Sequence, residues 1–518
     1  MSAEWTADDV SAGLAETAAV RPALLNWYKE ILDQLSGASH SSQYYDAVAG
    51  DWLTQFLHLV YAGLSNPPQH FDQVITTAIE VHADPGEFAI AASSGFNLAT
   101  QICTAIARHQ SGEDVDLVRA SPKTRRAVRS VSQLTIRNLA TRNANLLICG
   151  PTYRCNKSTW ARALLAWRKW ARWDELQYEI PHHDTLDCAL RKRLAREYAT
   201  ANSRRSIYFS LLPLFVPISL LEGFSTYRGS VLALDIKRPK ATYSTTSLHA
   251  HQTFKILAAE WREEGSQLLY HQHGGNYGLD KLHAIEQYER TVADRFYTWG
   301  WEDDDFRASP LSLPPPRSPT RRRRNRVMLN CLEMPRWVYR LHFQPMPGTM
   351  ETLISLTGDF LYGLQNIDDV VVRLYPQNLG WEIRRKLLSR RPNLRFDDHT
   401  LSAYDRYSEC QVVVHNYLGT SWLESLALNR PTVCFFDSDT YRFRDAALPY
   451  IDELIQLGVL HSSGSEAAIF VDQLGGDPEG WWMSVGVQDA RRRFVEKYAR
   501  FSQNWRKEWE QEFAAYLA

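Results

Sequence analysis

The sequence has no pair of cysteines at the spacing of a metal-binding or redox motif. Its seven cysteines are scattered along the chain, and no CxxC pair occurs among them. Free, mostly buried thiols in a reducing compartment fit this distribution better than a disulfide framework or a zinc framework. The cysteines therefore argue against a disulfide-stapled secreted domain and against a zinc ribbon.

Long apolar runs and an excess of one charge are also missing. The first 30 residues carry early acidic side chains and no apolar run of signal-peptide length, and no later window approaches the length of a membrane span. We therefore expect a cytoplasmic protein. With 58 basic and 59 acidic residues, the net charge gives no reason to expect a nucleic-acid partner.

What the sequence does have is enough chain for more than one core. At 518 residues, of which 44% are hydrophobic, it is too long for a single ordinary core. The segment 307–326 reads "RASPLSLPPPRSPTRRRRNR" and predicts an extended linker, because three consecutive prolines continue neither a helix nor a central strand. We expect a helical segment (1–119), an α/β domain (120–306), this linker (307–326), a second α/β domain (327–488) and an amphipathic C-terminal helix (489–518).

Apolar strands alternate with helical patterns on both sides of the linker. Strand-like runs before it are "ANLLICG", "ATYSTT" and "SQLLYHQ", and those after it are "RVMLNCL", "DVVVRLYP", "QVVVHNY" and "PTVCFFD". Such alternation predicts βαβ units and a parallel sheet in each domain, with ligands outside the carboxyl ends of the strands. Two Rossmann-like, doubly wound α/β domains with a cleft between them make a nucleotide-sugar transferase of the GT-B architecture the natural candidate.

The line "VVVHNYLGTSWLESLAL" is the most informative motif of the second domain. A buried strand ends at Asn416, Gly419 makes room, Thr420 or Ser421 opens a helix, and Glu424 lies in its first turn. The free amides and the dipole at a helix start favour a phosphate, the hydroxyls add hydrogen bonds, and the carboxylate suits ribose hydroxyls. The alternative is an ordinary capping box, which has the same spacing.

A second strand of this domain, in "VVRLYPQNLGW", contains Arg373. A buried guanidinium needs an anionic partner. One interpretation is a structural salt bridge to Asp397 or Asp398, and the other is a clamp on a phosphate or on a sugar carboxylate.

The first domain contains the cluster "YHQHGGNYG". His271 and His273 lie two residues apart and would face the same side of an extended strand, which suits a metal, but no third ligand follows at a local spacing. Gly274 and Gly275 allow the backbone to approach a ligand, and Tyr277 completes the cluster. A histidine there can donate a hydrogen bond or shuttle a proton. The alternative is a glycine turn with core histidines.

Two carboxylates of the first domain are candidates for a nucleophile or base. Asp235 ends the apolar run of "SVLALDIKRPK" and precedes Lys237, beside which it would stay ionised. It could equally cap the turn before Pro239. Glu222, in "PISLLEGF", is the second candidate.

Several blocks, in the same order over most of the chain, resemble one bacterial family. "QHGGNYG", "AIEQYERTVADRFYTWGW", "VVRLYPQNLGW" and "VVHNYLGTSWLESLALNRPTVCFFD" look like the signature of transferases encoded with O-antigen, capsule and lipopolysaccharide genes. More distantly, the arrangement is similar to transferases that take Kdo or a related ulosonic acid from a CMP-activated donor. The sequence departs from the family in "SLHAHQTFK", where His249 and His251 stand in place of an expected acidic or aromatic residue.

The resemblance implies that the second domain binds the CMP-sugar and the first binds a polysaccharide or lipid-linked glycan acceptor. It also implies that some members retain the anomeric configuration through a carboxylate nucleophile. No metal or other cofactor is required, because a helix terminus and basic groups can neutralise the CMP phosphate. The run Arg321 to Arg324 is a solvated part of the linker, with contact to the inner face of the cytoplasmic membrane as a hypothesis.

Two alternatives stay open beside a glycosyltransferase. One is a metal-dependent hydrolase or phosphotransferase built on His271 and His273, which predicts a bound metal. The other is a non-catalytic scaffold of a polysaccharide assembly complex, which predicts no nucleotide binding.

Overall fold

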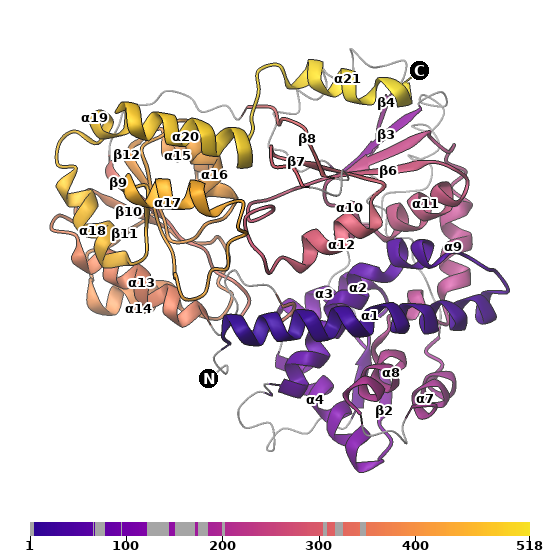
Figure 1. Cartoon of the computed structure of the whole chain (residues 1–518). Coiled ribbons are helices and arrows are strands. Elements are labelled where there is room, and N and C mark those ends of the chain that lie inside the picture. The colour runs from indigo at the N-terminus through magenta and orange to yellow at the C-terminus, as the bar shows by residue number, and fades with distance from the viewer. Residues whose placement is uncertain are drawn as a thin grey trace.

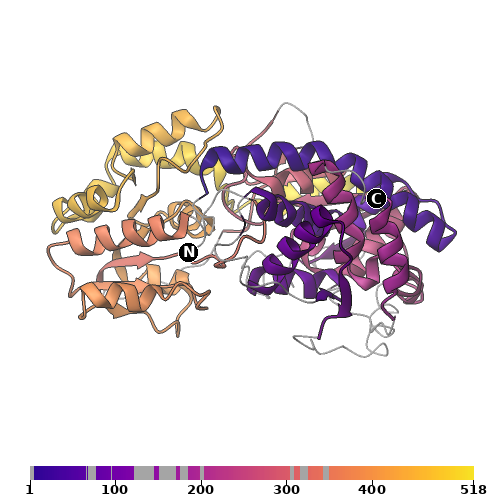
Figure 2. The same cartoon turned by 90° about the horizontal axis from the view of Figure 1, so that it is seen from below.

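The structure is a computed structural model that describes residues 5–65, 67, 78–94, 96–121, 145–150, 171–174, 185–198, 203–303, 308–315, 325–341 and 349–517. Within these ranges, the chain forms two parallel sheets of six strands each and one small sheet of two strands. The two large sheets belong to separate halves of the molecule, which lie side by side (Figures 1 and 2).

The chain opens with helices, as the sequence predicts. These are α1 (Ala7–Ser36), α2 (Ser42–Ser65), α3 (Pro85–Ser94) and α4 (Phe96–Ser111). Thr6 caps α1 in a capping box with Asp9, which supplies partners for amides that the first turn leaves unpaired. Two short parallel strands interrupt the helices, β1 (Ala78–Val81) and β2 (Asp116–Arg119). The helical pattern did not predict them.

The first large sheet has the strand order β4-β3-β5-β6-β7-β8. Its strands are β3 (Leu146–Cys149), β4 (Ala171–Asp174), β5 (Ala241–Ser244), β6 (Gln267–His271), β7 (Arg295–Thr298) and β8 (Ala308–Pro310). Its helices and helical turns are α7 (Cys188–Arg196), α8 (Arg204–Phe215), η2 (Ile218–Leu220), α9 (Phe224–Leu232), α10 (Ser247–Ala250), α11 (Gln252–Glu263) and α12 (Ala284–Val292). Because β8 pairs with β7, the sheet extends into the segment that we predicted as a linker.

The second large sheet has the strand order β11-β10-β9-β12-β13-β14. Its strands are β9 (Asn325–Asn330), β10 (Val370–Arg373), β11 (Arg395–Phe396), β12 (Cys410–His415), β13 (Thr432–Phe435) and β14 (Leu460–His461). In chain order this is 3-2-1-4-5-6, the classic dinucleotide-binding arrangement, whose order reverses between β9 and β12. The expected pair of Rossmann-like α/β domains, the GT-B architecture, is confirmed.

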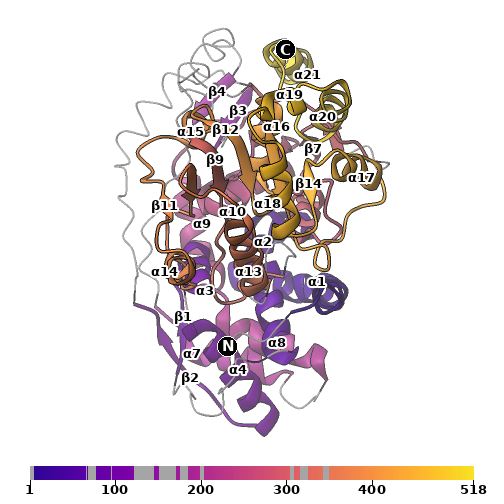
Figure 3. The ribbon, with the colours of Figure 1, turned by 90° about the vertical axis from the view of Figure 1, so that its left-hand side faces the viewer.

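Helices cover both faces of the second sheet, as the end view in Figure 3 shows. They are α13 (Met350–Gly363), α14 (Ile383–Arg390), α15 (Ala403–Tyr407), α16 (Thr420–Ala427), α17 (Leu448–Gln456), α18 (Gly464–Gln473) and α19 (Pro478–Trp482). Val412 and Val414 pack into the core under α13 and α18, whereas Val413 packs with α15. Both sets of alternating side chains are therefore buried, which is why these strands read as continuous apolar runs.

The C-terminal segment forms two helices instead of the single one that we predicted. α20 (Val485–Tyr498) packs on the second domain, and α21 (Trp505–Leu517) crosses back to the first domain (Figure 1). Trp509 and Phe513 of α21 pack with Tyr243 and Leu269 of the first sheet. The C-terminal segment therefore contacts both domains, α20 the second and α21 the first. Among the described residues, no helix is both long and apolar enough to cross a membrane.

Candidate active site

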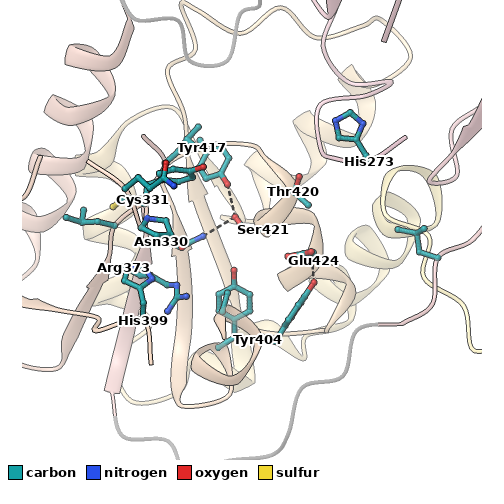
Figure 4. Close-up of a pocket in the computed structure, with 18 of the residues that line it drawn as sticks. His273, Asn330, Cys331, Arg373, His399, Tyr404, Tyr417, Thr420, Ser421 and Glu424 are labelled. Carbon is teal, nitrogen blue, oxygen red and sulfur yellow. Dashed lines mark hydrogen bonds between the residues drawn. The ribbon is translucent and has the colours of Figure 1, made fainter. Parts of the chain in front are cut away.

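A cavity of about 470 Å³ lies between the two domains, within the usual size range of small-molecule sites. Its floor is the carboxyl end of the second sheet at the point where the strand order reverses, and Asn330, the last residue of β9, lies there. The first domain contributes the opposite wall, which includes His273. This residue lies across the cavity from Ser421 (Figure 4). Of the predicted site residues, the cavity brings together His273, Arg373, Thr420, Ser421 and Glu424.

The hydroxyls at the start of α16 line the cavity and the domain contact, and the capping-box interpretation is wrong. Gly419 is the N-cap, and no side chain caps the helix. The Ser421 Oγ atom lies 3.0 Å from Asn330 Nδ2 and 3.0 Å from the Tyr417 hydroxyl. The first-turn amides have no side-chain cap, so the helix start is suited to an anion at the cavity.

Glu424 and Arg373 carry the opposite charges of the cavity. The Tyr404 hydroxyl donates a hydrogen bond to Glu424, which fixes the carboxylate one turn into α16. Arg373 forms the predicted salt bridge to Asp397, so the structural interpretation is confirmed, yet the same guanidinium also lines the cavity. Arg406 binds the other oxygen of Asp397 at 2.6 Å. Two guanidinium groups thus share one buried carboxylate.

Asn416 has a structural position beneath the cavity floor. Its amide oxygen accepts a hydrogen bond from the Leu332 amide at 3.0 Å, and its nitrogen donates to Thr357 at 3.0 Å. The side chain is buried and fixes the loops after β9 and β12 relative to each other. It therefore positions the site without lining it.

The two glycines after β6 bring the domains into direct contact. The Gly275 amide donates a hydrogen bond to Thr420 Oγ1 at 2.9 Å. A Cβ atom on Gly275 would lie 2.7 Å from the backbone of both Gly419 and Thr420, and one on Gly274 would lie 3.2 Å from Thr420 Oγ1. Only glycine permits this approach at position 275.

The expectation that His271 and His273 face the same side is wrong, because β6 ends at His271 and the chain then turns. His271 lies beneath α21, fully buried, with its Nδ1 atom 2.8 Å from the Tyr243 hydroxyl. Burial lowers the pKa of this imidazole to about 3, so it is neutral. His273 lies on the opposite side, where its Nδ1 atom is 3.0 Å from the Tyr277 hydroxyl.

His273 has a carboxylate behind it that sequence reasoning missed. Glu289 of α12 is fully buried, with Oε1 3.3 Å from His273 Nδ1 and 2.5 Å from His249 Nε2. The other nitrogen of His249 lies 2.7 Å from Asp51 of α2. Burial disfavours charge on both groups, but Asp51 together with Glu289 raises the pKa of His249 to about 9, and His273 together with His249 lowers the pKa of Glu289 to about 2.

His249, His273 and Glu289 are residue types that can hold a metal ion, and one ligand atom of each lies within 4.8 Å of the others. The sequence hinted at this cluster only in part: His249 departs from the family pattern, and Glu289 lies within a block of the resemblance. Neither lies at a local spacing from His273.

The three remaining candidates of the first domain lie away from the cavity. The predicted strand ending at Asp235 is wrong: "SVL" ends α9, and Asp235 is an exposed loop residue before β5, whereas the cavity lies beyond the carboxyl end of the sheet. Lys237 is exposed in the same loop. Glu222 forms a bidentate pair with the buried Arg191, at 3.0 and 2.7 Å, and so has a structural partner.

A family model settles which group of proteins this is. The model of the LIC12162 family transferase matches residues 5–513, which is nearly the whole chain. The chain belongs to the LIC12162 family of transferases. No curated protein matches the sequence of this LIC12162 family transferase.

Solved structures resemble the LIC12162 family transferase only distantly. A crystal structure of TarM is 12% identical over 56% of this chain and 57% of TarM, with a TM-score of 0.36. A mutant of the Thermobaculum terrenum O-GlcNAc transferase is 15% identical over 97% of this chain and 98% of its own, with a TM-score of 0.37. HepE of Anabaena, in complex with UDP and glucose, is 10% identical over 71% of this chain and 99% of its own, with a TM-score of 0.40. At these TM-scores the likenesses carry no argument about function.

Proposed function

We propose that this LIC12162 family transferase is a glycosyltransferase that moves an ulosonic acid such as Kdo from a CMP-activated donor onto a bacterial surface polysaccharide or glycolipid. The observation that carries the proposal is the position of the cavity. It opens at the switch point of a 3-2-1-4-5-6 sheet, where nucleotides bind in such folds, and its far wall belongs to a second domain.

The donor groups have matching partners in the cavity. The CMP phosphate would meet the first-turn amides of α16 and the Ser421 hydroxyl, and the ribose hydroxyls would meet Glu424. The carboxylate of an ulosonic acid would pair with Arg373, whose partner Asp397 is shared with Arg406. A neutral sugar would offer Arg373 no anionic partner in addition to Asp397, so the position of this guanidinium at the cavity favours an acidic sugar.

The acceptor would enter from the first domain, where His273 forms the opposite wall. A lipid-linked acceptor would bring the protein to the inner face of the cytoplasmic membrane. The basic run at Arg321 to Arg324, which we interpret as a solvated linker with such contact as a hypothesis, lies outside the described residues.

The metal-dependent hydrolase on His271 and His273 loses its basis, because α21 covers one of the two histidines and a turn separates them. The scaffold alternative leaves the cavity without a use.

Turnover tests the proposal directly. The full chain, CMP-Kdo and a Kdo-containing lipopolysaccharide core acceptor should release CMP faster than the same mixture without acceptor, whereas UDP-glucose should release no UDP. Release of UDP alone would replace the CMP donor by another nucleotide sugar. Release of neither, together with the absence of any bound nucleotide, would contradict a glycosyltransferase.

A further inference from the structure

His249 lies between two carboxylates, the buried Glu289 and the partly exposed Asp51. Its Nδ1 atom lies 2.7 Å from Asp51 and its Nε2 atom lies 2.5 Å from Glu289. A neutral imidazole carries only one N–H, so donation to both carboxylates requires the imidazolium form. Lys255, buried and 3.9 Å from Asp51, supplies the second positive charge. The positive charges thereby keep both carboxylates ionised, Glu289 in the interior and Asp51 at its edge.

Glu289, which lies behind His273, has one carboxylate oxygen that accepts no hydrogen bond among the described residues. Its side chain is fully buried, and Oε2 has no hydrogen-bond partner within the described part of the chain. Oε1 is 3.3 Å from His273 Nδ1. His273 also lines the cavity, and 28% of its side chain is exposed. A cavity, a histidine and then a buried carboxylate follow one another, as in enzymes where a carboxylate orients the histidine that acts as a base.

From these contacts we infer that His273 is the base that takes the proton of the acceptor hydroxyl, and that Glu289 and His249 are positioning residues that hold it in that role. This inference rests on the proposed glycosyltransferase function and names the catalytic centre of its acceptor side. The acceptor O–H bond breaks, with its proton passing to His273 Nε2. The oxygen forms a bond to the anomeric carbon, and the bond from that carbon to the phosphate breaks, so that CMP leaves with the electron pair.

A direct displacement of this kind inverts the anomeric configuration. Retention by double displacement would need a carboxylate nucleophile in the cavity. Among the described residues that line it, the carboxylate is Glu424, which lies on the donor side and is fixed by Tyr404. The candidates named for retention, Asp235 and Glu222, do not line the cavity.

Other charged and titratable groups surround the cluster from every packed element and set the background for any pH effect. They are Asp51 of α2, Lys255 of α11, Tyr270 of β6, Tyr277 and His283 before α12, Tyr288 of α12, and Arg340.

The pH dependence of Glu289→Gln separates positioning from mere packing. Activity of the wild type should rise with pH along an acidic limb, as a base that takes a proton requires. In Glu289→Gln, kcat should fall about 100-fold, and the acidic limb of the kcat/KM profile should move about one pH unit lower, because the neutral amide no longer favours the imidazolium. Glu289→Asp should restore the position of the limb, and KM for the donor should hardly change. A lower kcat with an unmoved limb would overturn the inference.

Nitrogen NMR of histidine-labelled full-length protein gives a readout that does not depend on transfer. The signal lost in His273→Gln should titrate at a lower pH in Glu289→Gln than in the wild type, because the neutral amide no longer favours the imidazolium. The signal lost in His249→Gln should stay that of an imidazolium. If these signals hold but CMP-Kdo is not consumed, the donor assignment fails and the base assignment stands. If transfer proceeds while the His273 pKa ignores Glu289, the base assignment fails.

Two further outcomes would overturn the inference. One is a product that retains the anomeric configuration together with a covalent sugar adduct in the intact mass. The other is stoichiometric binding of Zn²⁺, measured by dialysis and elemental analysis, that is lost in His249→Gln, since the ion would then occupy the donor atoms of the cluster.

Discussion

At the scale of single residues, the site depends on side chains whose hydrogen bonds lie at the cavity and not in a helix cap. Ser421 stands at a helix start without capping it, and its hydroxyl meets Asn330 and Tyr417 at the cavity floor. Ser463 has the other role, since its Oγ atom accepts the Glu466 amide at 3.1 Å and caps α18. The same residue type thus offers a matched pair of variants.

Ser421→Ala should weaken nucleotide binding about tenfold and leave the melting temperature of the free protein nearly unchanged, because a hydrogen bond to the phosphate is lost while no cap is removed. Ser463→Ala should do the reverse, costing about 1 kcal/mol of stability with no change in affinity. Calorimetric titration and thermal melts of both variants check this. Equal affinity losses in the two would contradict the assignment.

His273→Gln should abolish transfer, with kcat at least about 100-fold lower, while nucleotide affinity stays within about twofold of the wild type. The reason is that His273 forms the wall opposite the nucleotide subsite. CMP release and CMP titration, measured on the same preparation, check the two halves. A parallel loss of binding would place His273 in the donor site instead.

The sequence predicted the residues of the helix start correctly, but it did not predict the carboxylates of the first domain that lie near the cavity. The resemblance and the helix-start pattern located Thr420, Ser421 and Glu424 in the cavity. The prediction for Asp235 was wrong because "SVLAL" is as apolar at the end of a helix as it would be in a strand. Periodicity does not distinguish a helix from a strand over so few residues. Glu289 and Asp51 could not be found at all, because 238 positions separate them and only the packing of α12 on α2 brings both to His249.

At the scale of elements, the loop after β6 and the start of α16 form one interdomain joint. Gly275→Ala should disturb it more than Gly274→Ala, because the new Cβ atom would meet backbone at 2.7 Å in the first case and a rotatable hydroxyl at 3.2 Å in the second. We expect Gly275→Ala to lower turnover at least about tenfold and to lower the melting temperature. Side-by-side melts and CMP-release rates check it. Equal behaviour of the two variants would mean that the joint opens freely.

Sequence patterns predicted the elements of the second domain well and its closing segment poorly. The Val-rich runs gave β10 and β12, since buried parallel strands are apolar on both faces. The spacing of Trp505, Trp509 and Phe513 marks one buried helix face, but a helix pattern does not say which sheet it covers. The break between α20 and α21, and the return of α21 to the first domain, are properties of the tertiary structure.

At the scale of the whole molecule, a buried carboxyl lies where the domains meet. Asp280 pairs with Phe443 in a β-bridge, and its Oδ1 atom accepts the Leu282 amide at 2.8 Å. Burial raises the pKa of Asp280 from 3.8 to about 7. The folded protein therefore holds a proton between these pH values that the unfolded chain releases. Stability should thus fall as pH rises from 4 toward 7.

Asp280→Asn should remove this pH dependence and stabilise the protein above pH 7 by a few kcal/mol, with little change near pH 4. Asp445→Asn is the control, because Asp445 is exposed and pairs with Lys281 at the same domain contact. Urea unfolding at several pH values measures both. A gain of stability in Asp280→Asn that is equal at all pH values would contradict the buried-carboxyl account.

The central claim is that the carboxyl end of the second sheet binds the nucleotide of a sugar donor. Thermal melts of the full chain with CMP, UDP, GDP and ADP test it most directly. The account predicts that CMP raises the melting temperature more than the other three, and that the shift shrinks in Ser421→Ala and Glu424→Ala. If none of the four nucleotides stabilises the wild type, the claim is contradicted.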